Sequence, residues 1–335
     1  MNAFQKQLIP KDASIPPEKA GKSRSKVRLL HFDSLTKQMK HKQFERLPEV
    51  FRKGDVVVLN TSRTIPAVLH TMKGEEIRLS RQCRKGVWDV LFVKPPKRVF
   101  HRFPGGLTGK IVGRGSESPL IQMAFSLQGA VFFEHLYRHG DVVRYEHLSH
   151  PWSLRYFQTV YANEPGSVEM PSAGRAFTWK LINDLQRKGV KVESICLHAG
   201  LSYYGNDSWP SPALHPEPFT VSQKTVETIK HAKENGGRVV AVGTTVVRAL
   251  ESAHSPGGVL QPTKGETALY VTAESALSVV DGLLTGFHEF EASHLDMLTA
   301  FVTKEDLEAM YQEALKERYL WHEFGDMNLI LPSKA

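Results

Sequence analysis

Short apolar segments separated by turn residues fill the first half of the chain. Residues 56–59, Val-Val-Val-Leu, form an apolar run of strand length that ends at Asn60-Thr61-Ser62. Further apolar segments occupy residues 67–72, 87–93, 109–112, 121–126 and 141–145, and helical spacing occurs around residues 130–137. Most of the turns between them carry glycine or proline. This pattern predicts a small antiparallel β-barrel or sandwich over residues 66–149.

After Pro151 the pattern changes to strands that alternate with amphipathic helices. Thr178, Ser222 and Thr303 are preferred N-cap residues, and they predict helices that run to residues 187, 234 and 319. Strands are predicted over 190–197 and 238–242, and the second turns through residues 243–245 into a helix over 246–253. Such alternation predicts a mixed α/β core with a mostly parallel sheet and helices on it.

The composition is that of an ordinary globular protein of about two domains. The 335 residues are 41% hydrophobic and 23% charged. No apolar run of about 18 residues is present, so no membrane association is expected. Residues 1–25 are polar and lack the apolar core of a secretory signal, and we expect them to form a poorly ordered arm. Two cysteines, Cys83 and Cys196, suit a reducing compartment, so a cytoplasmic location is expected.

The net charge of +8 is unevenly distributed along the chain. Residues 1–110 hold 24 Lys and Arg against 9 Asp and Glu, whereas the remainder holds 19 against 26. A basic third joined to an acidic remainder is typical of an enzyme that acts on a polyanion. A lysine-rich surface in contact only with solvent is the alternative.

One predicted strand-to-helix turn, Gly243-Thr244-Thr245, offers a ligand site. The start of a helix presents unpaired backbone N–H groups and a partial positive charge, and the threonines add hydroxyls. A carboxylate, a phosphate or a ribose hydroxyl would fit there, and Arg248 could bind a carboxylate through two hydrogen bonds. The alternative is that Thr244 or Thr245 only caps the helix.

Other candidate side chains follow the ends of neighbouring predicted strands. They are His198, His215 with Glu217, and His288, although a single histidine in such a place is more often structural. Their spacing matches no zinc motif, so no metal is expected. Walker A, GxSxG and GxGxxG motifs are also missing from the sequence, which leaves the common NTPase, hydrolase and dinucleotide-binding classes unsupported.

Seven segments, in order along nearly the whole chain, resemble the S-adenosylmethionine:tRNA ribosyltransferase-isomerase family. They are residues 58–67, residues 156–162, Pro171-Ser172-Ala173-Gly174, Leu197-His198-Ala199-Gly200-Leu201, residues 242–251, Leu284-Thr285-Gly286-Phe287-His288 and Phe324-Gly325-Asp326. Seven ordered segments are far more specific than any one of them.

The resemblance implies an α/β catalytic domain, residues 1–65 and 150–335, with a β-barrel domain, residues 66–149, inserted in it. In the family's reaction the ribosyl part of S-adenosylmethionine moves to the aminomethyl group of 7-aminomethyl-7-deazaguanine in tRNA. The sugar rearranges to an epoxycyclopentane, and adenine and methionine leave, giving epoxyqueuosine in the queuosine pathway. S-adenosylmethionine is therefore the expected co-substrate, tRNA the expected partner, and a monomer the working expectation.

The matched segments also imply site residues. The candidates for proton transfer are His215, Glu217, His198, His288 and Asp326. The candidates for binding S-adenosylmethionine are Asn60, Arg63, Pro171, Ala173, Gly174, Thr178, Gly200, Gly243, Thr244, Thr245, Arg248, Thr285 and Phe287.

Several positions differ from the family's usual residues. Arg175 and Ala176 stand where Leu-His is usual, and Ser202-Tyr203-Tyr204 stands where Gly-Thr-Phe is usual. Ser211 and Pro212 replace an acid and a histidine, Gly286 replaces an asparagine, and Glu289-Phe290-Glu291-Ala292-Ser293 replaces Leu-Pro-x-Ser-Thr. Changes of this kind would suit a reshaped acceptor pocket. Two alternatives stay open: the same chemistry on a small-molecule acceptor, and a non-catalytic relative that binds nucleic acid. The sequence leaves the true acceptor, the general base and the oligomeric state undecided.

Overall fold

A nine-stranded sheet forms the centre of the molecule. The computed structural model describes residues 10–145, 147–148, 150–205, 208–254, 258–288 and 293–333. The strand order of the sheet is β16 (Thr263–Thr267), β14 (Glu217–Val221), β13 (Lys191–Leu197), β4 (Val56–Asn60), β15 (Val239–Val242), β17 (Gly282–Gly286), β19 (Met327–Ile330), β2 (Arg28–Phe32) and β3 (Met39–Gln43).

The nine-stranded sheet is mixed. Strands β13, β4, β15 and β17 pair in parallel, as do β19 and β2, whereas β16–β14, β14–β13, β17–β19 and β2–β3 are antiparallel. The predicted mixed α/β core is therefore present. Parallel pairing is concentrated at its centre, so the sheet as a whole is less parallel than the sequence pattern predicts.

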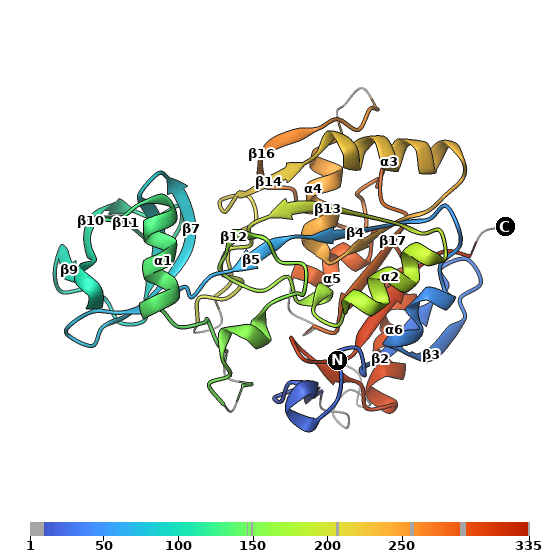
Figure 1. Cartoon of the computed structure of the whole chain (residues 1–335), viewed down its shortest axis with the longest axis horizontal. Helices are drawn as coiled ribbons and strands as arrows, with labels where there is room; N and C mark the ends of the chain where they lie inside the picture. The colour runs from blue at the N-terminus through green and yellow to red at the C-terminus, as the bar shows by residue number, and fades with distance from the viewer. Residues whose placement is uncertain are drawn as a thin grey trace.

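Both faces of this sheet are covered, which explains the continuous apolar run of β4. Val56 and Val58 pack with helices α3 (Gln223–Glu234), α4 (Thr244–Ser252), α5 (Ser293–Leu298) and α6 (Lys304–Lys316). Val57 and Leu59 point to the other face, against helix α2 (Trp179–Arg187) and the 3-10 helix η3 (Phe44–Glu49) (Figure 1). A strand buried on both faces needs apolar residues at successive positions rather than at alternate ones.

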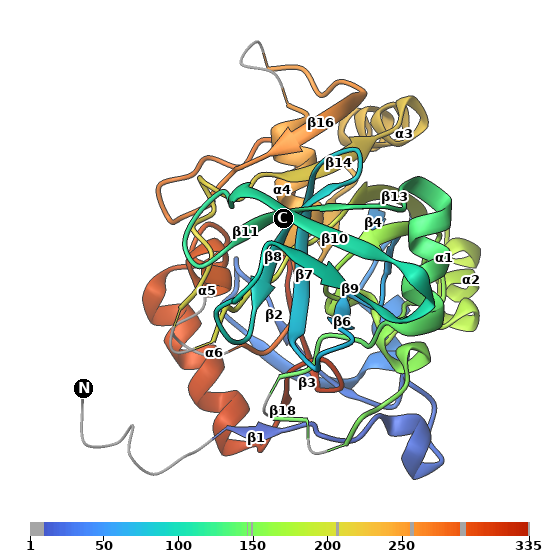
Figure 2. The same cartoon turned by 90° about the vertical axis from the view of Figure 1, so that its left-hand side faces the viewer.

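A second, six-stranded antiparallel sheet projects from the main body (Figure 1). Figure 2 looks onto this sheet, called here the inserted sheet. Its order is β6 (Val68–His70), β7 (Glu76–Arg84), β8 (Val87–Phe92), β11 (Ile121–Phe125), β10 (Thr108–Arg114) and β9 (Phe100–Arg102). Helix α1 (Gly129–His139) packs Phe132 and Leu136 into its core. Met72 N donates to Arg102 O at 2.8 Å, which joins the two edge strands and curls the sheet into a partial barrel.

Short elements complete the fold. Two parallel pairs join β1 (Lys11–Asp12) to β18 (Leu320–Trp321) and β5 (Ser62–Thr64) to β12 (Glu164–Ser167). The remaining 3-10 helices are η2 (Pro17–Ala20), η4 (Pro104–Gly106), η5 (Leu154–Phe157) and η6 (Ser172–Gly174). Among the described residues, no helix is both long enough and apolar enough to cross a membrane.

The predicted helix starts are confirmed. The hydroxyls of Thr178, Ser222 and Thr303 each accept a hydrogen bond from the backbone N–H three residues later, as N-caps do. Helix α6 ends at Lys316 rather than at Tyr319, which is buried in an aromatic cluster instead.

Two predictions for the first half of the chain are wrong. Residues 141–145 form no strand apart from a bridge between Asp141 and Val68, and β7 replaces them in the inserted sheet. Residues 10–25 are not a poorly ordered arm, because Ala13 is buried and β1 pairs with β18. Residues 1–9 lie outside the described part of the chain.

Candidate active-site cleft

A cleft of about 1350 Å³ lies between the nine-stranded sheet and the inserted sheet. Ala199 follows β13, Gly243 follows β15, and Thr285 lies near the end of β17, so the carboxyl ends of three strands line one side. Arg78 and Phe92 of the inserted sheet line the other. Ligands of open α/β sheets bind at this edge.

The start of α4 faces this cleft. Gly243 precedes the helix with a φ of 93°, and a Cβ there would approach Ala173 Cβ to 3.2 Å, so the position favours glycine. Helix α4 begins at Thr244 without a side-chain cap, so the interpretation of Thr244 or Thr245 as the N-cap residue is wrong. Thr245 Oγ1 accepts from Asn60 Nδ2 at 3.1 Å instead. Val246 N donates to Gly243 O at 3.1 Å, so the N–H groups of Thr244 and Thr245 are the ones left for a ligand.

Glu217 lines the cleft and is anchored at both of its carboxylate oxygens. Its Oε1 accepts from Gly200 N at 2.9 Å, and its Oε2 pairs with Arg248 Nη1. Arg248 also donates from Nε to Leu269 O at 3.0 Å and from Nη2 to Thr267 O at 3.1 Å. The guanidinium therefore holds Glu217, and a two-pronged contact with a ligand carboxylate would have to displace these bonds.

His215 lies beside Glu217 and belongs to the cleft lining. Its side chain is 4% exposed, its Nε2 is 3.1 Å from Ser80 Oγ, and its Nδ1 has no hydrogen-bond partner in the described structure. Burial lowers the pKa of His215, while the charge of Glu217 opposes this. A neutral imidazole with one free ring nitrogen is suited to accept or pass on a proton. A Cβ at Gly200 would approach Nε2 to 2.6 Å, so glycine leaves room for the ring.

The inserted sheet contributes directly to this region. Ser80 of β7 contacts His215, and Arg81 Nη1 donates to Pro216 O at 3.3 Å. Glu117, in the loop between β10 and β11, accepts from Tyr204 Oη at 2.9 Å and from Ser211 N at 3.0 Å. These bonds fasten the segment that carries His215 to the inserted sheet.

Glu169 is a cleft residue that the sequence analysis missed. Its Oε1 accepts from Ser202 N at 2.7 Å and from Tyr145 Oη. Burial raises the pKa of Glu169 to about 7, which the charge of Glu323 reinforces and the hydrogen bonds from Tyr145 and Ser202 oppose. No motif marks Glu169 in the sequence, because its hydrogen-bond donors, Tyr145 and Ser202, and the nearby Glu323 come from segments far apart in the chain.

The predicted site residues divide into two groups. The cleft is lined by Pro171, Ala173, Gly200, Gly243, Thr244, Thr245, Arg248, Thr285, His215, Glu217 and His288. The others lie outside the lining: Asn60, Arg63, Gly174, Thr178, His198, Phe287 and Asp326.

The second group has structural surroundings. Asn60 Nδ2 donates to Leu197 O at 2.9 Å, and His198 Nδ1 lies 2.7 Å from Ser62 Oγ. Asp326 accepts from Arg28 N and Leu320 N at 2.6 and 2.8 Å. The Arg63 guanidinium lies over the ring of Tyr137, and Phe287 packs in the core among Tyr311, Tyr319 and Trp321. Thr178 caps α2, and Gly174 is buried beside Tyr161.

Among the unusual positions Pro212 lines the cleft, whereas Arg175, Ala176, Ser211 and Gly286 are not part of its lining. Arg175 is 2% exposed, pairs with Glu18 at 2.9 Å and donates to Tyr156 O at 2.9 Å. Ala176 is buried in the core, Ser211 bonds to Glu117, and Gly286 lies in β17. The altered residues 289–292 fall outside the described residues. By contrast Ser202, Tyr203 and Tyr204, which replace the family's usual Gly-Thr-Phe, do line the cleft.

In the part of the chain that the structure describes, no group of three or more His, Cys, Asp or Glu is arranged to hold a metal ion. The cleft instead brings together carboxylates, a helix start and aromatic rings.

Comparisons with known proteins agree along the whole chain. A family model described as queuosine biosynthesis protein matches residues 5–330. The chain is similar to S-adenosylmethionine:tRNA ribosyltransferase-isomerase of Carboxydothermus hydrogenoformans, with 36% identity over 95% of this chain and 96% of the relative. It is 35% identical to the protein of that name from Natranaerobius thermophilus, over 92% of this chain and 93% of the relative. The crystal structure of S-adenosylmethionine tRNA ribosyltransferase from Thermotoga maritima matches with a TM-score of 0.53 and 27% identity, covering 98% and 97% of the two chains.

Proposed function

The chain belongs to the queuosine biosynthesis protein family, and on this premise we propose that it is an S-adenosylmethionine:tRNA ribosyltransferase-isomerase. The observation that carries this function is the full-length similarity to relatives of that name, with 32–36% identity. The enzyme transfers and isomerises the ribosyl group of S-adenosylmethionine onto 7-aminomethyl-7-deazaguanine in tRNA, and it releases adenine and methionine.

The start of α4 is the proposed place of the donor's carboxylate. Backbone N–H groups and the helix dipole favour an anion there. The donor also carries a sulfonium and an ammonium group, and the carboxylate of Glu217 in the same cleft favours these cations. We assign donor binding to the cleft-lining members of the matched segments, which are Pro171, Ala173, Gly200, Gly243, Thr244, Thr245, Arg248 and Thr285.

We assign proton transfer to His215, Glu217 and His288, which line the cleft. His215 has the open Nδ1 described above, and Glu217 is held by Arg248 and by the Gly200 amide. Residues such as Asn60, which bonds to Thr245, act through the groups that they position. The protein residues of this proposal require no metal.

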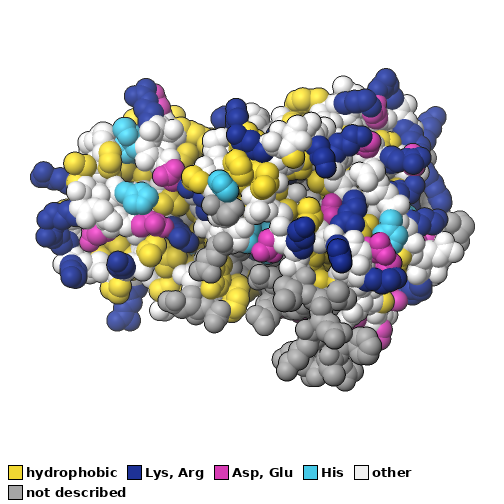
Figure 3. Space-filling view, turned by 90° about the horizontal axis from the view of Figure 1, so that it is seen from below, with side chains coloured by type: hydrophobic (Ala, Val, Ile, Leu, Met, Phe, Trp, Pro, Cys, Tyr) yellow, Lys and Arg dark blue, Asp and Glu magenta, His cyan; other side chains and the backbone are white. Residues whose placement is uncertain are grey.

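The inserted sheet is the proposed docking surface for tRNA. Figure 3 shows Lys and Arg side chains gathered at the end of the molecule that this sheet forms. Lys94, Lys97, Arg98 and Arg102 are exposed there, and none of them forms an ion pair with another described residue. Free cations can replace the counterions of phosphates, so such a surface supports binding of a nucleic acid.

We also propose that the chain consists of a catalytic domain and a domain inserted into it. Strands β6 to β11 and helix α1 lie within residues 66–149, which supports an inserted domain with these bounds between catalytic residues 1–65 and 150–335. A tRNA substrate supports a cytoplasmic location.

Product analysis tests the function. The enzyme is incubated with S-adenosylmethionine and tRNA that carries 7-aminomethyl-7-deazaguanine, and free adenine and the nucleoside masses are measured. We expect one adenine per modified nucleoside, and none with tRNA that carries guanine at the same position. Release of adenine without modification of this tRNA would contradict the proposed acceptor.

A further inference from the structure

Glu169 lies among half-buried polar and aromatic groups to which the assignments above give no role. Val168 N donates to Ala199 O at 2.8 Å, and Ser202 N donates to Glu169 Oε1 at 2.7 Å, so two neighbouring segments fix the carboxylate in the cleft. Tyr145 Oη donates to the same oxygen. Both bonds end on Oε1.

The charges around Glu169 differ from those around Glu217. Glu217 pairs with Arg248, whereas no Lys or Arg forms an ion pair with Glu169 in the described structure. The charged and titratable groups beside Glu169 or on the adjacent cleft lining are Tyr145, Glu323, His147, His322, Asp12 and Arg144. Of these, His147 is 2.7 Å from Glu323, His322 is 3.1 Å from Asp12, and Arg144 is 3.5 Å from Asp141, so each of the two imidazoles and the guanidinium already faces another carboxylate. A positively charged ligand group would therefore be favoured beside Glu169.

The carboxylate is also suited to proton transfer near neutral pH. Burial raises the pKa of Glu169 to about 7, and a base works best when its pKa lies near the working pH. The pKa of Tyr145 is raised well above its usual value, by burial and by the nearby carboxylate of Glu169. Tyr145 therefore stays protonated near neutral pH and donates its hydrogen bond to Glu169 whether or not Glu169 is ionised.

The acceptor supplies a matching cation. An alkyl amine such as that of lysine has a pKa of about 10.4 and is an ammonium ion at neutral pH, without a free electron pair. Before it can attack the donor, the aminomethyl group must lose a proton. Tyr203 and Trp209 line the same cleft with ring centroids 5.5 Å apart, and they offer faces against which a flat base can stack.

We propose that Glu169 is the general base that accepts a proton from the aminomethyl ammonium group of the acceptor base, a role that rests on the proposed function. In this step an N–H bond breaks, an O–H bond forms on Glu169, and the electron pair stays on the nitrogen. That electron pair can then form the C–N bond to the ribosyl group of S-adenosylmethionine, in the overall transfer that breaks the bonds of this group to methionine and adenine and releases both.

Glu169→Gln tests this role, because glutamine keeps an oxygen for Ser202 N and Tyr145 Oη but cannot act as the base. Glu251→Gln is the matched control: Glu251 also accepts from backbone N–H groups, those of Ser278, Val279 and Val280, but it lies outside the cleft lining. In single turnovers at pH 7.5 with tRNA that carries 7-aminomethyl-7-deazaguanine, we expect Glu169→Gln to be about 10²–10⁴-fold slower than wild type. Glu251→Gln should stay within about twofold.

The wild-type enzyme separates the two proposals. A wild type that does not modify this tRNA refutes the proposed function. An active wild type with an equally active Glu169→Gln refutes only the role of Glu169. Affinity for S-adenosylmethionine, measured by calorimetry without tRNA, should be unchanged in Glu169→Gln, and a tenfold loss would overturn the proposal in favour of a donor-binding role.

The pH dependence distinguishes a base from a residue that only shapes the cleft. As the pH rises toward the amine's own pKa, more acceptor is already neutral, so the defect of Glu169→Gln should shrink by close to tenfold per pH unit. A defect that stays constant between pH 7 and pH 9.5 would overturn the role as a base.

Tyr145→Phe tests the same role with the carboxylate in place. The hydrogen bond from Tyr145 lowers the pKa of Glu169, so its removal should raise that pKa. The rise of the single-turnover rate with pH should therefore shift to higher pH in Tyr145→Phe. An unshifted rise would contradict the assignment.

Discussion

Glu169 and Glu217 accept hydrogen bonds from backbone amides only two residues apart, Ser202 N at 2.7 Å and Gly200 N at 2.9 Å. Two residues of chain span at most about 7 Å, so one short segment sets the spacing of two carboxylates in the cleft. Their surroundings differ, since Glu217 has Arg248 as a partner and Glu169 has none among the described cations. Acids in different environments can take different roles in one reaction.

Removal of Arg248 should destabilise the protein through Glu217. Glu217 is 8% exposed, and Arg248→Ala leaves its charge buried without a cationic partner, which should lower the free energy of unfolding by roughly 3–5 kcal/mol. The double variant Arg248→Ala, Glu217→Gln should regain part of this loss, with a coupling of about 0.5–3 kcal/mol in urea denaturation. Strictly additive effects would show that the pair is not coupled.

The same variant tests the donor site. If Arg248 also supports the donor's carboxylate, Arg248→Ala should weaken S-adenosylmethionine binding about tenfold or more in calorimetry. Unchanged affinity in the folded variant would limit Arg248 to holding Glu217.

The ionisation of Glu169 should make the protein less stable at high pH. Its pKa is raised from 4.5 to about 7, so the folded state binds this proton more tightly than the unfolded state does. The proton's contribution to stability is fully present below pH 4.5 and is lost as the pH rises through about 7. Glu169→Gln should therefore exceed the wild type by roughly 1–3 kcal/mol in urea denaturation at pH 8.5, and by much less at pH 4.5. An equal difference at both pH values would contradict the raised pKa.

His215 should be required for turnover, and Ser80 should support it. We expect His215→Ala to lower the turnover rate about 10²–10⁴-fold if His215 transfers a proton. Ser80→Ala removes the partner of Nε2 and should cause a smaller loss of the same kind, at unchanged affinity for S-adenosylmethionine. Losses below threefold with normal stability would assign His215 to structure.

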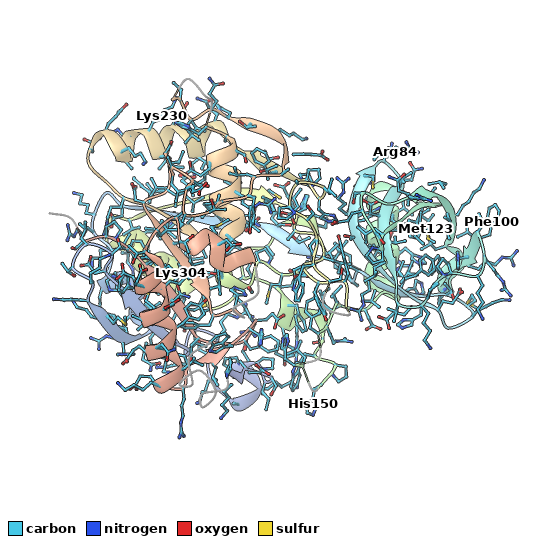
Figure 4. All side chains as sticks on the ribbon, turned by 180° about the vertical axis from the view of Figure 1, so that it is seen from behind. Arg84, Phe100, Met123, His150, Lys230 and Lys304 are labelled. Atoms are coloured by element: carbon cyan, nitrogen blue, oxygen red, sulfur yellow. The ribbon has the colours of Figure 1, made fainter. Side chains whose placement is uncertain are left out.

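The inserted sheet should determine the salt dependence of tRNA binding. Replacement of Lys94, Lys97, Arg98 and Arg102 by glutamate should weaken tRNA binding. The slope of log affinity against log salt concentration should become less steep by about 0.9 for each lost phosphate contact. Lys230→Glu is the control, because Figure 4 shows Lys230 on α3, far from Phe100 at the tip of the inserted sheet. If the wild type, the charge-reversed variant and Lys230→Glu all had the same salt dependence of tRNA affinity, tRNA would have to bind to another surface.

Local chemistry in the sequence determined the elements of the catalytic core. The caps at Thr178, Ser222 and Thr303 were predictable because a hydroxyl bonds to an amide three residues away. The apolar run of β4 indicated burial on both faces, and Gly243 marked the turn into α4. The inserted sheet was less well defined, since the charged residues of β7 hide its alternation.

Tertiary structure alone decided which side chains share the cleft. The sequence grouped His198 and Asp326 with His215, yet folding bonds the first to Ser62 and the second to Arg28, whereas Ser80 of the inserted sheet reaches His215. Arg175 looked like an altered pocket residue until Glu18, 157 positions away, proved to be the ion-pair partner of its buried guanidinium. Propensity and capping act over a few residues, whereas burial, ion pairs and the pKa of a carboxyl such as Glu169 depend on segments that meet only when the chain closes on itself.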